Sequence, residues 1–197
     1  MSGTRFTLPG MEIHPLTAER MPDLADLFDS NGTTRGCWCM WFVLPRKEFG
    51  AGWSGGNRER FAEFAGSGPP AGVVAYDAGT PIGWCAIRPR SAYPRAIGPR
   101  SIMRERDRSE DDAVWLVSCF FVRVGFRRAG LTGDLLAAAV DLAAEHGAHA
   151  VEGFPQVTPS RDGFVGYEKV FAAHGFRVVA RPSPKRVIMR RALVADE

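Results

Sequence analysis

The most informative stretch of this sequence is Val122-Arg123-Val124-Gly125-Phe126-Arg127-Arg128-Ala129-Gly130-Leu131-Thr132. It lies between a strongly apolar segment and a segment with helical periodicity, so it reads as a strand-to-helix loop. Backbone N–H groups at a helix N-terminus are unpaired, and the helix dipole makes that end positive. Gly130 lets the backbone approach a ligand closely, and Arg127 and Arg128 add positive charge. The stretch therefore predicts a phosphate or pyrophosphate site, against the plainer alternative of a turn with two surface arginines.

The segments on either side of this loop predict a strand and a helix. Residues 113–122 are apolar apart from Ser118, which is typical of a central strand buried on both faces. Residues 132–146 repeat apolar side chains on one helical face, and Gly147 follows as a C-terminal cap. Together they predict a strand–loop–helix unit at the centre of the fold.

The remaining elements follow from shorter patterns. Strands are expected over residues 11–15, 71–76, 82–87, 150–154, 176–180 and 187–189, and further helices after Thr17, over 57–65 and over 164–174. Residues 31–57 are expected to be irregular, and the charge-rich residues 88–112 to form a solvated loop. This order predicts one α/β domain over residues 11–192, a mixed and mostly antiparallel sheet flanked by helices, after a flexible tail over residues 1–10.

Composition excludes several classes of protein. The chain has 197 residues, 45% of them hydrophobic and 24% charged, which suits a single globular core. A net charge of +3 does not demand nucleic acid, and no apolar run approaches the roughly 20 residues of a membrane helix. With no readable signal segment and only four cysteines, we expect a cytoplasmic protein with reduced thiols and no metal.

The stretch over residues 122–132 resembles the acetyl-CoA motif of GCN5-related N-acetyltransferases, V-x-P-x-y-R-G-x-G-[IL]-[GA]. The resemblance extends over about residues 11–190 through the order of elements and through Gly175-Phe176 after the last helix. It implies acetyl-CoA as co-substrate, held by a bulged strand and by the loop that follows it. The residues that it assigns to the cofactor are Phe121, Val122, Arg127, Arg128, Ala129, Gly130, Leu131, Thr132 and Gly133.

This sequence departs from the family pattern at several positions. Within the motif, the departures are Val124 for proline, Arg128 for glycine and Thr132 for a smaller residue. Thr132 is still expected to accept a hydrogen bond from a first-turn N–H. Family members often carry an asparagine and, seven residues later, a tyrosine that protonates the departing thiolate. Phe164 and Phe171 stand at those positions here, so Tyr167, one helical turn earlier on the same face, is the nearest substitute acid.

Two further residues are candidates for the chemistry. Glu152, in the strand after the main helix, is the carboxylate expected to enter the cleft, where burial would suit a general base. A paired or edge-exposed glutamate is the alternative. Cys119 lies on the central strand and is a candidate nucleophile for a ping-pong route. Direct transfer is the family's usual route, and an ordinary core cysteine is the alternative for Cys119.

The resemblance also implies that the segment between the first helix and the second strand, which is rich in aromatic residues here, lines the acceptor side of the cleft. Trp38, Cys39, Trp41 and Trp84 are expected to enclose an apolar or planar acceptor, or else to form a hydrophobic plug under a long loop. The sequence thus predicts an N-acetyltransferase acting on a small-molecule amine, with a homodimer as an open expectation. The alternatives are a protein N-acetyltransferase, a non-catalytic acyl-CoA-binding domain, and a nucleic-acid- or protein-binding module using Arg88 to Arg108.

Overall fold

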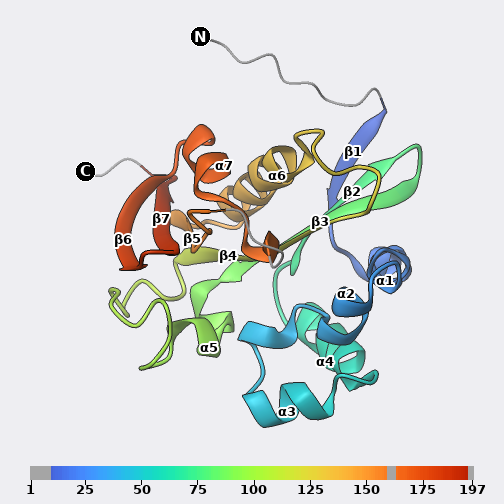
Figure 1. The fold of residues 1–197 in the computed structure, drawn as a ribbon, viewed down its shortest axis with the longest axis horizontal. Coiled ribbons are helices and arrows are strands. Elements are labelled where there is room, and N and C mark those ends of the chain that lie inside the picture. Colours follow the sequence, from blue (N-terminus) through green and yellow to red (C-terminus); the bar gives the residue numbers. More distant parts are fainter. Residues whose placement is uncertain (1–9, 159–162, 195–197) are drawn as a thin grey trace.

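A seven-stranded sheet with the order β1-β2-β3-β4-β5-β7-β6 organises the chain (Figure 1). This computed structural model describes residues 10–158 and 163–194, so the expected N-terminal tail lies almost wholly outside it. The strands are β1 (Met11–Pro15), β2 (Gly72–Asp77), β3 (Thr80–Pro89), β4 (Val114–Val122), β5 (Ala150–Gly153), β6 (Arg177–Ser183) and β7 (Arg186–Ala192). Only the β4–β5 pair is parallel, which confirms the predicted mixed, mostly antiparallel sheet.

Helices cover both faces of this sheet (Figure 1). The helices α6 (Leu131–Glu145) and α7 (Glu168–Ala173) lie on one face. The helices α1 (Met21–Asp29), α2 (Gly32–Cys37), α3 (Arg46–Ala51) and α4 (Gly56–Gly66) lie on the other. Shorter turns of helix are η1 (Ala18–Arg20), η2 (Met40–Phe42), η3 (Arg90–Ala92), α5 (Pro94–Ile97) and η4 (Gly163–Val165). None of the described helices is long and apolar enough to cross a bilayer.

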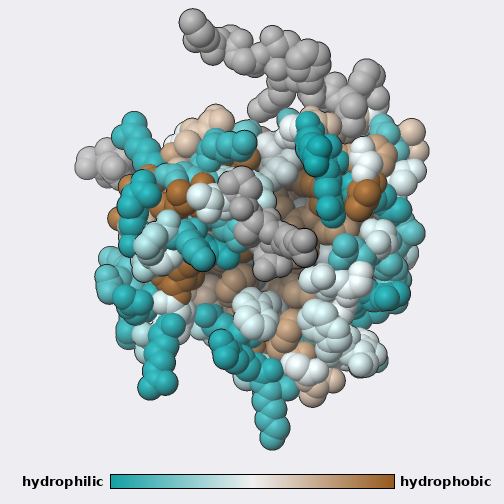
Figure 2. All heavy atoms as spheres, viewed as in Figure 1, coloured by the Kyte–Doolittle hydropathy of each residue, from teal (hydrophilic) through white to brown (hydrophobic). Residues whose placement is uncertain are grey.

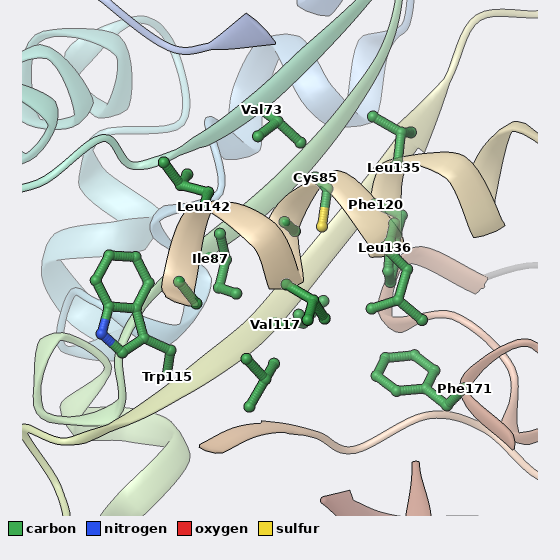
Figure 3. Close-up of a cluster of buried hydrophobic side chains, with 14 of the residues drawn as sticks. Val73, Cys85, Ile87, Trp115, Val117, Phe120, Leu135, Leu136, Leu142 and Phe171 are labelled. Carbon is green, nitrogen blue, oxygen red and sulfur yellow. The ribbon is translucent and has the colours of Figure 1, made fainter. Parts of the chain in front are cut away.

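The core between α6 and the sheet positions the strand–loop–helix unit. Leu135 and Leu136 of α6 pack over Val117 and Phe120 of β4, with Ile87 of β3 beside them (Figure 3). Each fully buried side chain of this size contributes about 1.5–3 kcal/mol. The strand is also buried on its opposite face, as its apolar run predicts, so the end of β4 and the start of α6 are held in a defined relation.

The aromatic segment over residues 31–57 is more regular than its sequence predicts. It forms α2, η2 and α3, each too short to show a helical period in the sequence. The buried Asn57 side chain ties them together, because its amide donates to the carbonyls of Gly36 at 2.8 Å and Phe49 at 3.1 Å. The expectation of an irregular segment is therefore wrong, and tertiary contacts supply the reason.

The prediction of a solvated loop over residues 88–112 is wrong for the part of the segment around Arg90, although residues 104, 105 and 107–109 are exposed as expected. Its Arg90 side chain is only 1% exposed, and its guanidinium donates to Asp111 at 2.7 Å and to Glu152 of β5 at 2.8 Å. Arg106 pairs with the same Asp111 at 2.6 Å. These charges compensate one another, so the segment folds against the sheet instead of remaining in water.

The last helix is shorter than the expected residues 164–174. Gly166 has a φ of +76°, a left-handed conformation that favours glycine, and it interrupts any helix running from η4 into α7. The helix begins at Glu168, so Tyr167 is its N-cap residue and lies outside the helix. The expected placement of Tyr167 one turn before Phe171 on a shared helical face is therefore wrong.

Candidate functional site

The strands β4 and β5 separate in the middle of the sheet. They pair from Val114 opposite Ala150 to Val117 opposite Gly153, and β4 then continues to Val122 without β5. Within residues 10–158 and 163–194, no strand pairs with this last part of β4 on the side away from β3. Its backbone groups on that edge, including those around Val122, can therefore pair with an extended ligand.

The loop between β4 and α6 has the backbone of an anion site. Gly125, Arg128 and Gly130 have φ values of +101°, +68° and +87°, all in the left-handed region. Gly130 is the N-cap of α6 and, as a glycine, has no side chain with which to cap that helix end. The helix starts at Leu131, one residue earlier than predicted, so Thr132 is its second residue and does not stand at the N-cap. The uncapped N-terminus of this 15-residue helix suits a negatively charged ligand.

The side chains of the loop add charge and anchor the helix. Arg127 donates from Nε to the carbonyl of Val122 at 3.0 Å, while Arg127, Arg128 and Ala129 are all exposed. Neither arginine takes part in an ion pair within the described part of the chain. Leu131 is buried against the sheet and holds the helix end in place.

Gly133, the remaining residue assigned to the cofactor, has a structural constraint of its own. A Cβ atom there would lie 2.7 Å from Cε1 of His174, which follows α7. His174 is itself fixed, since its Nδ1 lies 2.8 Å from the carbonyl oxygen of Val170. Packing between the two helices therefore explains this glycine without a ligand.

Glu152 is the paired glutamate rather than a free carboxylate of the cleft. Its side chain is 6% exposed, and its Oε2 accepts from Arg90 while its Oε1 accepts from Arg190 of β7 at 3.2 Å. Both carboxylate oxygens are therefore occupied by guanidinium groups, and neither is left free to take a proton from an amine. Of the two alternatives for Glu152, a general base in the cleft or a paired glutamate, the structure contains the paired glutamate, which lines a small cavity beside Arg90 and Arg190.

Tyr167 and Phe171 lie at different depths. The Tyr167 hydroxyl lies against Gly163 of η4, since a Cβ atom on that glycine would lie only 2.2 Å from the hydroxyl oxygen. Phe171 is fully buried, and its ring makes an edge contact with that of Phe120 at 6.1 Å between centroids (Figure 3). It makes a second edge contact with the ring of Phe176 at 5.0 Å. The position where family members carry a tyrosine is thus part of the core here.

Cys119 has no activating neighbour in the described chain. Its hydrogen bond with the Cys39 thiol, followed by burial, raises the pKa of Cys119 well above its ordinary value. Cys39 also accepts from Nε1 of Trp84 at 3.3 Å. A protonated thiol is a poor nucleophile, so the arrangement fits the alternative of a core cysteine better than a ping-pong route.

The aromatic residues expected to enclose an acceptor divide into core and surface. Trp38 and Trp84 are 1% and 0% exposed and pack with Phe28 and Phe61 under the helices. For these two the hydrophobic plug is the correct alternative, and the expectation of acceptor contacts is wrong. Trp41 is 41% exposed, with the guanidinium of Arg95 4.1 Å from its ring centroid. Figure 2 shows hydrophobic surface around the middle of the viewed face and hydrophilic side chains along its left and lower edges.

Similarity to solved structures extends over the whole chain. A GCN5-related N-acetyltransferase from Kribbella flavida is 18% identical, with 95% of this chain and 100% of that one covered and a TM-score of 0.58. A ribosomal-protein-alanine N-acetyltransferase from Brucella melitensis is 18% identical, with 92% and 99% covered and a TM-score of 0.56. The PaiA N-acetyltransferase from Thermoplasma acidophilum, solved in complex with coenzyme A, is 13% identical, with 92% and 98% covered and a TM-score of 0.52.

At these identities the structural matches show the fold, and the sequence comparison shows the family. No curated protein matches this sequence. The sequence model of the Acetyltransferase (GNAT) family matches residues 38–164, which include the end of β4, the loop and α6. Since that match spans more than half of the 197 residues, the chain belongs to the GNAT acetyltransferase family.

Proposed function

We propose that this protein transfers the acetyl group of acetyl-CoA to an amine of a small-molecule acceptor, by direct attack of the amine on the thioester. The observation that carries the proposal is the uncapped N-terminus of α6 beside the unpartnered edge of β4. Backbone groups of Phe121 and Val122 would pair with the extended arm of the cofactor, and the loop from Arg127 to Gly133 would hold its phosphates. Bound acetyl-CoA supplies an activated acyl group.

Positioning explains most of the rate in this proposal. Backbone N–H groups at the end of β4 would stabilise negative charge on the carbonyl oxygen during attack. Glu152 is paired with two arginines, and the thiol of Cys119 stays protonated, so neither offers a free base or nucleophile. Thiols have a pKa near 8–9, so the CoA thiolate leaves readily without a strong acid.

A groove between η2 and α4 supports a small amine as acceptor. Its volume of about 520 Å³ lies within the usual range for small-molecule sites. Phe64 and Met40 contribute apolar surface. The two carboxylates of Glu59 and Glu63 outnumber the one guanidinium of Arg60, which favours a cationic ligand. Met40 directly follows Cys39, whose thiol contacts Cys119 of β4, so the groove lies close to the central strand.

The proposal is tested by measuring thiol release from acetyl-CoA with a panel of small amines and peptides. We expect amine-dependent release of free CoA with at least one small amine. Binding of acetyl-CoA without turnover on any amine would instead identify a non-catalytic acyl-CoA-binding domain. Turnover confined to peptide N-termini would identify a protein N-acetyltransferase, and absence of acetyl-CoA binding would refute the cofactor assignment itself.

Arg127 and Arg128 are expected to contribute to cofactor affinity. Replacing either with alanine removes a charge-assisted hydrogen bond to phosphate in an exposed site, which costs roughly 1–2 kcal/mol, or about 5–30-fold in Kd. Isothermal titration with acetyl-CoA measures the change. Arg35→Ala is the matched control, since Arg35 is an exposed arginine of α2 on the opposite face of the sheet. Equal affinities for all three variants would contradict the assignment.

Restoring the family's tyrosine with Phe171→Tyr is expected to destabilise the protein without raising kcat. The ring is fully buried between Phe120 and Phe176, so its new hydroxyl would lie in apolar surroundings. An unpaired buried hydroxyl costs about 1–3 kcal/mol. Thermal unfolding and steady-state kinetics check both parts. An increase in kcat with an unchanged Tm would show that the thiolate still requires an acid from α7.

A further inference from the structure

Ser118 occupies the point where β4 changes its pairing on both sides. Cys119 pairs with Ala86 and Val117 with Ile87, so Ser118 is an extra residue with no partner on β3, a β-bulge. Pairing with β5 also stops at Val117. The bulge therefore begins the unpartnered edge of β4 to which the proposed function assigns the thioester arm. A single hydroxyl in an otherwise apolar strand is the sequence signal for this residue.

The Ser118 hydroxyl is buried and lies near the hydroxyl of Tyr93. The residue is 2% exposed, and its Oγ has no well-formed partner among the described residues. Its neighbours on β4 divide between the two faces of the sheet, since Val117 packs toward α6 and Leu116 packs with Tyr93. A buried hydroxyl left unpaired costs about 1–3 kcal/mol, which a purely structural role would not require.

Tyr93, which directly follows η3, has a second buried hydroxyl, and it lies near that of Ser118. It is 1% exposed, and its phenol oxygen also has no well-formed partner in the described chain. Burial raises the pKa of Tyr93 well above its ordinary value, and the nearby Ser118 hydroxyl offsets only part of that rise. The phenol therefore keeps its proton at neutral pH and serves as a hydrogen-bond donor.

We propose that Ser118 carries the proton from the attacking amine to the departing sulfur, and that Tyr93 positions the Ser118 hydroxyl for this transfer. The inference rests on the proposed function. As the C–N bond forms and the C–S bond breaks, Oγ of Ser118 takes the proton of the attacking nitrogen and gives its own to the CoA thiolate. The serine ends unchanged, so no other base, acid or co-reactant is needed.

This proposal explains how the reaction can proceed without a free carboxylate as base and without the family's tyrosine as acid. Both oxygens of Glu152 are taken up by arginines, and the position of the family's tyrosine holds the buried Phe171. A neutral hydroxyl that both accepts and donates a proton replaces a separate base and acid. It also suits apolar surroundings, because no net charge develops on the protein during the transfer.

The test compares Ser118→Ala, Ser118→Thr and Tyr93→Phe with the wild-type enzyme on an amine that it acetylates. We expect Ser118→Ala to lower kcat about 100-fold with acetyl-CoA affinity unchanged, and Ser118→Thr to recover most of that loss. Tyr93→Phe should lower kcat about tenfold and alter the solvent deuterium isotope effect on kcat. Neither Ser118→Ala nor Tyr93→Phe should lower Tm by more than a few degrees, because neither hydroxyl makes a well-formed hydrogen bond in the described chain.

Tyr76→Phe is the matched control. Tyr76 lies on β2, far from the bulge, and its hydroxyl donates to Asp23 of α1 at 2.8 Å. It should lower Tm and leave kcat unchanged. A folded Ser118→Ala variant with near wild-type kcat would overturn the proton shuttle while leaving the acetyltransferase proposal intact. Loss of activity in Ser118→Ala together with loss of acetyl-CoA binding would overturn it too, because the serine would then be a binding residue. Failure of the wild-type enzyme to acetylate any amine would overturn the proposed function itself.

Discussion

Gly130→Val is expected to weaken acetyl-CoA binding by roughly 100-fold or more, equivalent to about 2.7 kcal/mol. Gly130 has a φ of +87° at the N-cap of α6, where a β-branched residue is strained. No described atom lies within 4 Å of where its Cβ would be, so the valine meets no protein group. The added methyl groups would instead occupy the space proposed for the pyrophosphate. Isothermal titration measures the loss.

Gly147→Val is the control for backbone strain. Gly147 follows the other end of α6, has a φ of +76°, and likewise has open space around its Cβ position. Both variants should lower Tm by similar amounts, while only Gly130→Val should lose cofactor affinity. If both variants bind acetyl-CoA as the wild-type protein does, the helix N-terminus is not the phosphate site.

Glu152→Gln is expected to lower the free energy of unfolding by about 3 kcal/mol and to leave kcat nearly unchanged. Removing the charge of one partner leaves the buried Arg90 guanidinium less compensated, and breaking buried pairs typically costs about 3–5 kcal/mol. For a chain of this length, that corresponds to a fall in Tm of about 6–12 °C. Thermal unfolding, together with kinetics well below the transition, measures both quantities.

Glu110→Gln is the matched control for Glu152. Glu110 pairs with the same Arg190, but its side chain is 35% exposed, so the loss should stay below about 1 kcal/mol. A general base would behave in the opposite way. If Glu152→Gln keeps its Tm and loses kcat by about 100-fold or more, then Glu152 is catalytic despite its pairing.

Local sequence patterns determined the parts of this protein that depend on near neighbours. Three such patterns are the apolar run of β4, the periodicity of α6 and the glycine at residue 130. Each determines the conformation of residues that are close to it in the sequence. Their order therefore predicts the strand–loop–helix unit, the mixed sheet and the cofactor loop. The family motif lies in the same stretch, so the likeness to acetyltransferases is also readable from it.

Charge pairing was decided by the tertiary structure alone. Arg90 and Glu152 lie 62 residues apart in sequence, and nothing near either residue shows that they meet in the core. A run of charges therefore reads as a solvated loop until its partners are known. The same uncertainty made Glu152 a candidate base, since a carboxylate's basicity depends on what surrounds it.

Packing likewise decided which side chains are buried and where the short helices begin and end. Trp38 and Trp84 are buried because α1, α2 and α4 cover that face of the sheet, which composition cannot show. Tyr167 lies outside the helix because Gly166 adopts a left-handed conformation. Glycine can adopt either hand, so the sequence alone does not predict this. Ser118 became distinctive only through the pairing of β4 with two other strands, since a bulge is a property of strand pairs and not of one strand.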